Sequence, residues 1–273
     1  MTPQHPNEDI LHRIIARKHI ELKRQKEAVS LHTMLAMGDE RIERPIYSLR
    51  KALAASPTGI IAEFKRRSPS GRHIAQGALV ADVIPAYQKA GAAACSILTD
   101  ESFFGGSLGD LRSARRLTTL PLLRKDFIID PYQVYQARIM GADAILLIAS
   151  ALTPGDCASL ASTAHSLGME TMLEVHTPDE MLAYLTSHID ILGVNNRNLG
   201  TFDTDTTNSL RLSRHIGVAD HSMLILVSES GISDPATIMR LRAAGFRGFL
   251  IGTALMKEAQ PGDALAKLIG GLG

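Results

Sequence analysis

The sequence predicts an α/β fold, a (β/α)8 TIM barrel with an N-terminal helical extension. Short apolar runs recur at intervals of roughly 20 to 35 residues, which is the length of one strand and one helix. Glycine ends many of the intervening helical stretches. Polar residues end most of the apolar runs, as expected where the strands of a closed barrel meet at one pocket. This distribution favours the barrel over the alternative, an open doubly wound sheet.

A charged helical stretch precedes the predicted barrel. Residues 9–37 repeat apolar side chains at helical spacing, and their charged side is most simply a solvated face. Proline and glycine within residues 44–59 then break the pattern. No linker or low-complexity segment follows, so we predict one domain over residues 1–273, with 1–50 as the helical extension.

The predicted strands are short and largely apolar, as expected for a parallel sheet that is buried on both faces. Gly91, Gly141, Gly168 and Gly245 stand where the preceding helices should end in the left-handed conformation. The strands are predicted to begin near Ile60, Ala93, Leu120, Ala144, Glu170, Ile191, Leu224 and Gly248.

Composition narrows the class of protein. The chain has 29 basic and 28 acidic residues and a net charge of +1, so charge indicates neither a nucleic-acid nor a membrane partner. The polar N-terminus lacks a signal peptide, and two cysteines do not suggest a disulfide framework. Ten scattered histidines show no metal-binding pair. We expect a cytoplasmic protein without a metal site, a monomer or weak homo-oligomer, that binds a small molecule.

The clearest functional signal is charge inside an apolar strand. Glu63 and Lys65 lie two positions apart, so both project from the same side of the strand. Buried charges cost free energy unless they are paired or solvated in a cleft. A structural ion pair within the barrel is the simpler alternative. Polar residues at the ends of later apolar runs favour a shared pocket: Lys125, Glu174, Asn195, Arg197 and Glu229.

The last two strands predict a phosphate site. Ser230-Gly231 and Gly252-Thr253 each follow an apolar run and open a helical stretch. Glycine lets backbone N–H groups approach an anion, and loops after strands seven and eight often bind phosphate in such barrels. Tight packing of strand against helix is the alternative. Lys65 lies near the seam between the first and last strands, where its ammonium can reach an anion.

Several segments together resemble indole-3-glycerol-phosphate synthase. RKDFIID and ESFFGGS are the most specific, because they are long and are not shared with other phosphate-binding barrels. The resemblance implies closure of an indole ring from 1-(2-carboxyphenylamino)-1-deoxyribulose 5-phosphate, with loss of carbon dioxide and water and with no cofactor, in tryptophan biosynthesis. The matching segments include IIAEFKRRSPSGR, SILTDESFFGGSLGDL, PLLRKDFIIDPYQVYQAR, GADAILLIAS, LEVH, ILGVNNRNL, VSESGI and FLIGTALM.

The resemblance also implies roles. Lys125 matches the general acid, Glu174 the proton acceptor, and Lys65 a lysine that binds substrate anions, although sequence leaves open which lysine serves which step. Glu63, Asn195 and Glu229 match residues that orient the lysines and the ribulose hydroxyls. The remaining matches are Arg197 near the carboxylate, Phe104 and Leu146 as apolar walls, Ser68 in the first loop, and Ser230, Gly231, Gly252 and Thr253 around the phosphate.

Two departures and two rival functions remain. The family's SPSKG reads SPSGR here, so Arg72 is expected to replace the missing lysine, and Thr253 stands where serine is usual. An acidic lysine needs a lowered pKa, which burial and neighbouring Arg124 would favour and nearby carboxylates would oppose. Phosphoribosylanthranilate isomerase is disfavoured because the first strand has no cysteine. A non-catalytic barrel is disfavoured because Lys125 and Glu174 are both present.

Overall fold

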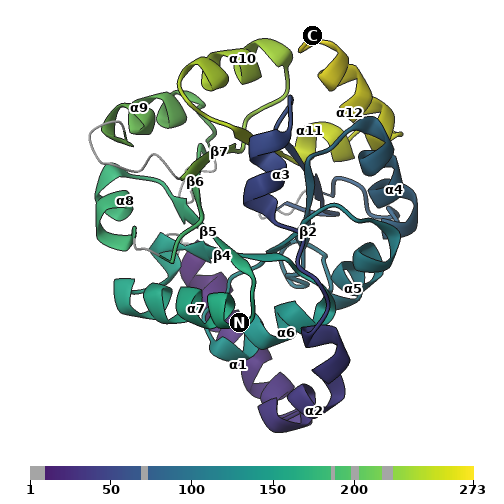
Figure 1. Cartoon of the computed structure of the whole chain (residues 1–273), viewed down its shortest axis with the longest axis vertical. Coiled ribbons are helices and arrows are strands. Elements are labelled where there is room, and N and C mark those ends of the chain that lie inside the picture. Colours follow the sequence, from purple (N-terminus) through teal and green to yellow (C-terminus); the bar gives the residue numbers. More distant parts are fainter. Residues whose placement is uncertain (1–9, 69–72, 186–187, 198–202, 217–223) are drawn as a thin grey trace, which may run out of the picture.

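The strands form a closed parallel barrel. The computed structural model describes residues 10–68, 73–185, 188–197, 203–216 and 224–273, without the side chains of 39–41. Within these ranges the strands pair in sequence order from β1 to β8, and β1 closes the ring by pairing with β8 (Figure 1). The predicted fold class is confirmed. The strands are β1 (Ile60–Phe64), β2 (Ala94–Leu98), β3 (Leu122–Lys125), β4 (Ala144–Ile148), β5 (Glu170–Val175), β6 (Ile191–Asn195), β7 (Ile225–Glu229) and β8 (Gly248–Ile251).

Helices surround the barrel, and their ends follow local sequence. Gly91 and Gly141 end α4 and α6 at φ 94° and 104°, a conformation that glycine adopts without steric cost. Asp130 and Asp234 cap the N-termini of α6 and α10 through their carboxylates. The helices after β1 are α4 (Val80–Ala90), α5 (Leu108–Leu117), α6 (Pro131–Met140), α7 (Pro154–Ser166), α8 (Pro178–Tyr184), α9 (Thr207–Ile216), α10 (Pro235–Ala243), α11 (Thr253–Met256) and α12 (Pro261–Gly270), with the 3-10 turn η1 (Ala149–Ala151) after β4.

Side-chain alternation divides the core into two layers. In β1, Ile60, Ala62 and Phe64 pack outward among the helices. Ile61 points into the barrel, where it joins a cluster contributed by other strands. Glu63 shares this inward side, because side chains alternate along a strand. The sequence of β1 therefore builds the helix-facing core and the floor of a cavity from the same five residues.

The N-terminal extension forms separate helices rather than the one stretch predicted for residues 9–37. These are α1 (Ile10–Ala28), α2 (Leu31–Ile42) and α3 (Leu49–Ala55). The first two separate at Ser30, whose hydroxyl accepts a hydrogen bond from the Thr33 backbone at 3.1 Å, as an N-cap does. Because helix propensity varies little across this stretch, the cap decides where α2 begins.

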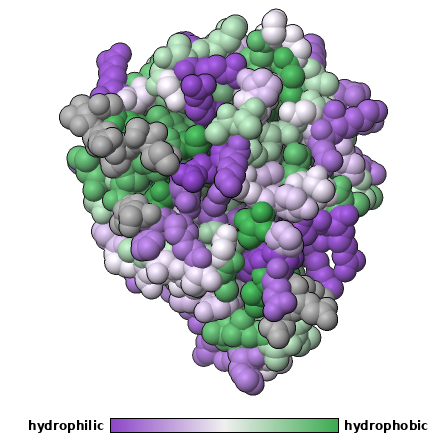
Figure 2. Space-filling view, in the orientation of Figure 1, coloured by the Kyte–Doolittle hydropathy of each residue, from purple (hydrophilic) through white to green (hydrophobic). Residues whose placement is uncertain are grey.

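Two of these helices cover the barrel interior. Figure 1 shows α3 across the middle of the ring of strands, where Leu49 and Leu53 are buried in the inner cluster. Leu11 and Ile14 of α1 join the same cluster together with Phe127, which follows β3. The outer surface mixes hydrophilic and hydrophobic residues on the face seen in Figure 2.

Candidate active site

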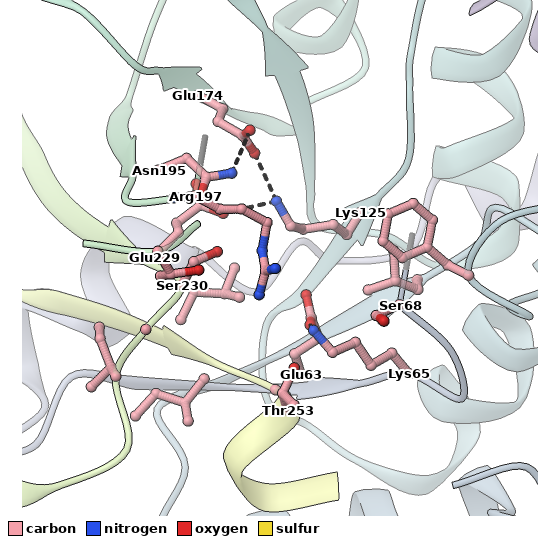
Figure 3. Close-up of a pocket in the computed structure, with 18 of the residues that line it drawn as sticks. Glu63, Lys65, Ser68, Lys125, Glu174, Asn195, Arg197, Glu229, Ser230 and Thr253 are labelled. Carbon is pink, nitrogen blue, oxygen red and sulfur yellow. Dashed lines mark hydrogen bonds and ion pairs between the residues drawn. The ribbon is translucent and has the colours of Figure 1, made fainter. Parts of the chain in front are cut away.

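A cavity of about 350 Å³ opens at the carboxyl ends of the strands. In barrel enzymes this end carries the active site, because the strand ends and the following loops converge there. The structure brings every predicted site residue to this one cavity (Figure 3). They are Glu63, Lys65, Ser68, Phe104, Lys125, Leu146, Glu174, Asn195, Arg197, Glu229, Ser230, Gly231, Gly252 and Thr253.

Lys125 forms the centre of the larger charged cluster. Its Nζ lies 2.8 Å from Glu174 Oε2 and 2.8 Å from Glu229 Oε2, so β3 is joined to β5 and β7 across the cavity. Asn195 on β6 donates from Nδ2 to Glu174 Oε1 at 2.8 Å. A Cβ on Gly193 would lie 2.4 Å from Glu229 Oε1, so a glycine at this position makes room for the carboxylate.

Lys65 and Glu63 form the smaller cluster on the other side of the cavity (Figure 3). Lys65 Nζ lies 2.8 Å from Glu63 Oε1, and both residues come from the end of β1. A Cβ on Gly252 would lie 2.2 Å from the same oxygen, so the loop after β8 also needs a glycine here. The pair is thus seated against the segment that was predicted to bind phosphate.

Burial and neighbouring charges shift the pKa values of Lys125, Glu174 and Glu229 away from their ordinary values. Burial favours neutral Lys125, but the carboxylates of Glu174 and Glu229 outweigh it and raise the lysine pKa above its ordinary value. Burial also acts on Glu174, yet the Lys125 ammonium and the Asn195 hydrogen bond leave its pKa below the usual range. Burial raises the pKa of Glu229 to about 7, against the opposing pull of Lys125 and with the help of Glu174. The cluster therefore holds an ammonium, a carboxylate and an acid that titrates near neutrality.

The loops after β7 and β8 line the opposite end of the cavity. Ser230 has φ 68°, and among the described residues it is the one non-glycine with a positive φ. Gly231 follows at φ 76°, where a Cβ would lie 2.5 Å from Thr204 Cγ2. Left-handed backbone at a bulky residue costs free energy and tends to occur at functional sites. Asn196 supports the turn by donating to the Ser230 carbonyl at 3.0 Å.

An apolar wall lines the remaining side. Phe104 lies against Phe127 with ring centroids 6.1 Å apart, and both rings border the cavity. Leu146 and Ile148 project from β4 into the same region. The cavity thus combines a floor of paired lysines and glutamates, an apolar wall and a glycine-lined end, which suits a ligand with an aromatic ring and a phosphate.

Comparison with known proteins assigns the chain to a family. The family model for indole-3-glycerol phosphate synthase matches residues 11–268. The chain belongs to the indole-3-glycerol phosphate synthase family. An indole-3-glycerol phosphate synthase of Bacteroides thetaiotaomicron is 54% identical over 261 residues, which are 96% of this chain and 98% of the relative. One from Burkholderia ambifaria is 43% identical, over 95% of this chain and 98% of the relative.

Family membership confirms the predicted family and makes the chain a carboxy-lyase of tryptophan biosynthesis. Among solved structures, a mutant tryptophan synthase alpha-subunit from Pyrococcus furiosus superimposes with a TM-score of 0.59 at 18% identity. The match covers 80% of this chain and 98% of that one. At this identity the likeness bears on the fold alone, and it agrees with the closed barrel.

One electrostatic expectation for this synthase was wrong in direction. The pKa of Lys125 is raised rather than lowered, because the carboxylates of Glu174 and Glu229 outweigh the effect of burial. The Arg124 guanidinium points the other way and bonds to Asp126 at 2.9 Å and to the Gln133 carbonyl at 2.8 Å. Neighbours in a strand face opposite sides, so the cation next in sequence cannot oppose the carboxylates that surround Lys125.

The cavity also includes residues that the sequence analysis did not select. Phe127 stands two positions after Lys125 in RKDFIID, so the motif held the signal, but no role was assigned to this residue. Thr204 and Lys257 also line the cavity and belong to no motif of their own. His176 lies 3.8 Å from Glu174 Oε1 and does not line the cavity. Arg72, the expected substitute in the first loop, lies outside the described residues.

Two features are absent from the described ranges. No group of three or more His, Cys, Asp or Glu side chains that could hold a metal ion is found there. None of the helices in those ranges combines the length and apolar character needed to cross a membrane.

Proposed function

We propose that Lys125 and Glu174 carry the acid and base steps by which this synthase closes the indole ring. The observation that carries the proposal is the pair of 2.8 Å contacts that hold the Lys125 ammonium between Glu174 and Glu229 at the cavity floor. The substrate is 1-(2-carboxyphenylamino)-1-deoxyribulose 5-phosphate, and the products are indole-3-glycerol phosphate, carbon dioxide and water.

Ring closure needs a proton at the ribulose carbonyl oxygen. The ring carbon that bears the carboxylate attacks the carbonyl carbon, and the oxygen gains negative charge as the new bond forms. Lys125 is an ammonium at neutral pH because the carboxylates raise its pKa. It still donates readily, since the developing alkoxide is more basic than an amine. The dearomatised ring then loses carbon dioxide, and the bonding electrons restore aromaticity without a cofactor.

Dehydration needs an acid and a base. Lys125, reprotonated from solvent after ring closure, protonates the departing hydroxyl, which leaves as water. Glu174 accepts the proton from the adjacent carbon, because its lowered pKa keeps it a carboxylate. Asn195 orients that carboxylate through its 2.8 Å hydrogen bond. Glu229 sets the other flank of Lys125 and orients the ribulose hydroxyls.

Each substrate group has a matching side of the cavity. Lys65 and the residues Ser230, Gly231, Gly252 and Thr253 suit the phosphate, since backbone N–H groups and an ammonium bind it strongly. Arg197 suits the ring carboxylate, because its guanidinium reaches into the cavity (Figure 3). The wall of Phe104 and Leu146 suits the anthranilate ring, and Ser68 borders the entrance from the first loop.

Several properties of the molecule complete the proposal. The enzyme acts without a metal or cofactor, because carbon dioxide loss is driven by rearomatisation. We place it in the cytoplasm as a single domain, monomeric or weakly homo-oligomeric, with no nucleic-acid or membrane partner. Family membership supports this setting.

Indole fluorescence tests the assignment of the acid. The chain contains no tryptophan, so product emission rises over a low protein background. Purified wild type should convert the substrate, and Lys125→Met should lose nearly all turnover while it keeps its circular dichroism spectrum. Methionine retains the apolar stem and removes only the ammonium.

The other outcomes are equally clear. Equal turnover by Lys125→Met would move the acid role to Lys65. Absence of product from well-folded wild type would overturn the proposed function and direct attention to the SPSGR loop.

A further inference from the structure

A buried lysine outside the cavity joins the N-terminal extension to the apolar wall. Lys18 on α1 is 5% exposed, although a lysine on a surface helix normally reaches water. Its Nζ lies 3.0 Å from Asp100 Oδ2 and 2.9 Å from Asp126 Oδ1, and both carboxylates are buried. The predicted solvated face of this helix is therefore interrupted by an internal ion pair network.

Each of the two carboxylates also holds the backbone of a wall residue. Asp100 Oδ1 accepts hydrogen bonds from the backbone N–H groups of Phe103 at 2.8 Å and Phe104 at 3.3 Å. Asp126 Oδ1 accepts one from the backbone N–H of Phe127 at 2.8 Å. The two carboxylates that contact Lys18 therefore also hold the backbone of Phe104 and Phe127, the aromatic residues of the wall.

The network joins two loops that come from different strands. Asp100 follows β2 and Asp126 follows β3, yet the rings of Phe104 and Phe127 must meet to form one surface. The Lys18 ammonium bridges the two carboxylates, and Thr99 Oγ1 adds a direct hydrogen bond to Asp126 Oδ2 at 2.6 Å. Asp126 has a second cation in Arg124 at 2.9 Å, whereas among the described residues Lys18 is the one cation that contacts the Asp100 carboxylate.

We propose that Lys18 is a positioning residue that sets the aromatic wall of the active site from the N-terminal extension. The inference rests on the proposed function, because it assumes that Phe104 and Phe127 contact the substrate ring. A second tie supports it: Ser102 donates to Glu21 Oε1 at 2.7 Å, so α1 holds the loop after β2 at two points. The extension then contributes to substrate binding without lining the cavity.

Kinetics of Lys18→Met test this role against a purely structural one. We expect kcat/KM to fall about tenfold or more, chiefly through KM, because a misplaced wall binds the ring poorly. Leu22→Ala is the matched control. Leu22 is a buried residue on the same helix that packs in a different cluster, with Tyr132 and Ile139. The control should lower the melting temperature and leave KM near that of wild type.

A fluorescent reporter tests the same point without substrate. Phe103→Trp places the sole tryptophan of the chain on the turn held by Asp100, at a half-buried position that does not line the cavity. We expect its emission to shift to longer wavelength when Lys18→Met is added, and to stay unchanged when Leu22→Ala is added. Because no turnover is measured, this result stands even if the proposed reaction is wrong.

The outcomes separate the two proposals. Wild-type KM in folded Lys18→Met, or an equal rise of KM in Leu22→Ala, would overturn the positioning role alone. If Lys18→Met does not fold, Lys18→Met/Asp100→Asn removes one unpaired buried carboxylate, and the asparagine oxygen can still accept from the turn. That double variant should keep the loss of kcat/KM, and wild-type kinetics there would also overturn the proposal.

Discussion

The two lysines of the cavity are held in different ways. Lys125 stands at the end of β3 between carboxylates that come from two other strands, β5 and β7. Lys65 lies just beyond the end of β1 and pairs with Glu63 of its own strand. One ammonium is therefore held across the barrel, and within the described part of the chain the other pairs with a carboxylate two positions away in sequence.

This difference in contacts indicates different roles for Lys125 and Lys65. A proton donor gains from a fixed position, because efficiency depends on the geometry of the transfer. A ligand for a substrate anion gains from freedom, because it must exchange its carboxylate partner for phosphate when the substrate binds. We therefore assign proton donation to Lys125 and anion binding to Lys65.

Substituting each lysine by methionine tests this comparison and has the largest expected effect. Lys125→Met should lower kcat by about a thousandfold, within the range for loss of a general acid. Lys65→Met should instead raise KM by about tenfold, the loss of one charge-assisted hydrogen bond, with a smaller change in kcat. Steady-state rates from indole fluorescence measure both. A collapse of kcat in Lys65→Met alone would reverse the two roles.

Glu174→Gln tests the base that completes the larger cluster. Loss of the proton acceptor should lower kcat about a hundredfold, and KM should change little because the amide keeps the shape of the carboxylate. Single-turnover experiments should show a ring-closed, non-fluorescent intermediate that accumulates before dehydration. If the substrate itself persists, Glu174 acts earlier than we propose.

Gly193→Ala sharpens the comparison through packing alone. The added Cβ would meet Glu229 Oε1 at 2.4 Å and Met172 Cε at 2.7 Å, so the carboxylate must shift from the position in which it contacts Lys125. We expect kcat to fall about tenfold, because a small displacement of a catalytic group is costly. Gly77→Ala is the control, since a Cβ there meets nothing within 4 Å. Equal kinetics in the two variants would mean that Glu229 does not fix Lys125.

The sequence predicted the barrel because its signals are local. Gly91 and Gly141 end helices through their own backbone freedom, and each apolar run forms a strand beside its neighbour in sequence. The split of the N-terminal stretch at Ser30 was missed because one capping hydrogen bond decides it. Burial of Lys18 was also missed, since its partners Asp100 and Asp126 lie far along the chain.

The site residues also divide into those that the local sequence predicts and those that depend on distant contacts. Glu63 and Lys65 were selected because two charges in an apolar strand need a special environment. Phe127 was not selected, because an aromatic residue beside a strand fits the core equally well. The direction of the Lys125 pKa shift depends on whether the facing carboxylates outweigh burial, and only the three-dimensional contacts with Glu174 and Glu229 decide that. The catalytic roles themselves stay predictions.

The titration of Glu229 gives the smallest expected effect and the finest test of the comparison. Its pKa of about 7 reflects burial and the nearby carboxylates, with Lys125 acting in the opposite direction. Carbon-13 NMR of protein labelled at glutamate carboxyls should therefore show one resonance with a midpoint near pH 7. Glu229→Gln should remove that resonance and leave the others.

The sign of the lysine's influence can be read from the same titration. Lys125→Met removes the cation that stabilises ionised Glu229, so the midpoint should move above 7. Lys65→Met should move it much less, because Lys65 pairs with Glu63 and not with Glu229. Equal shifts in the two variants would show that both lysines act equally on the pKa of Glu229. The different roles of the two lysines would then be supported by the kinetics alone.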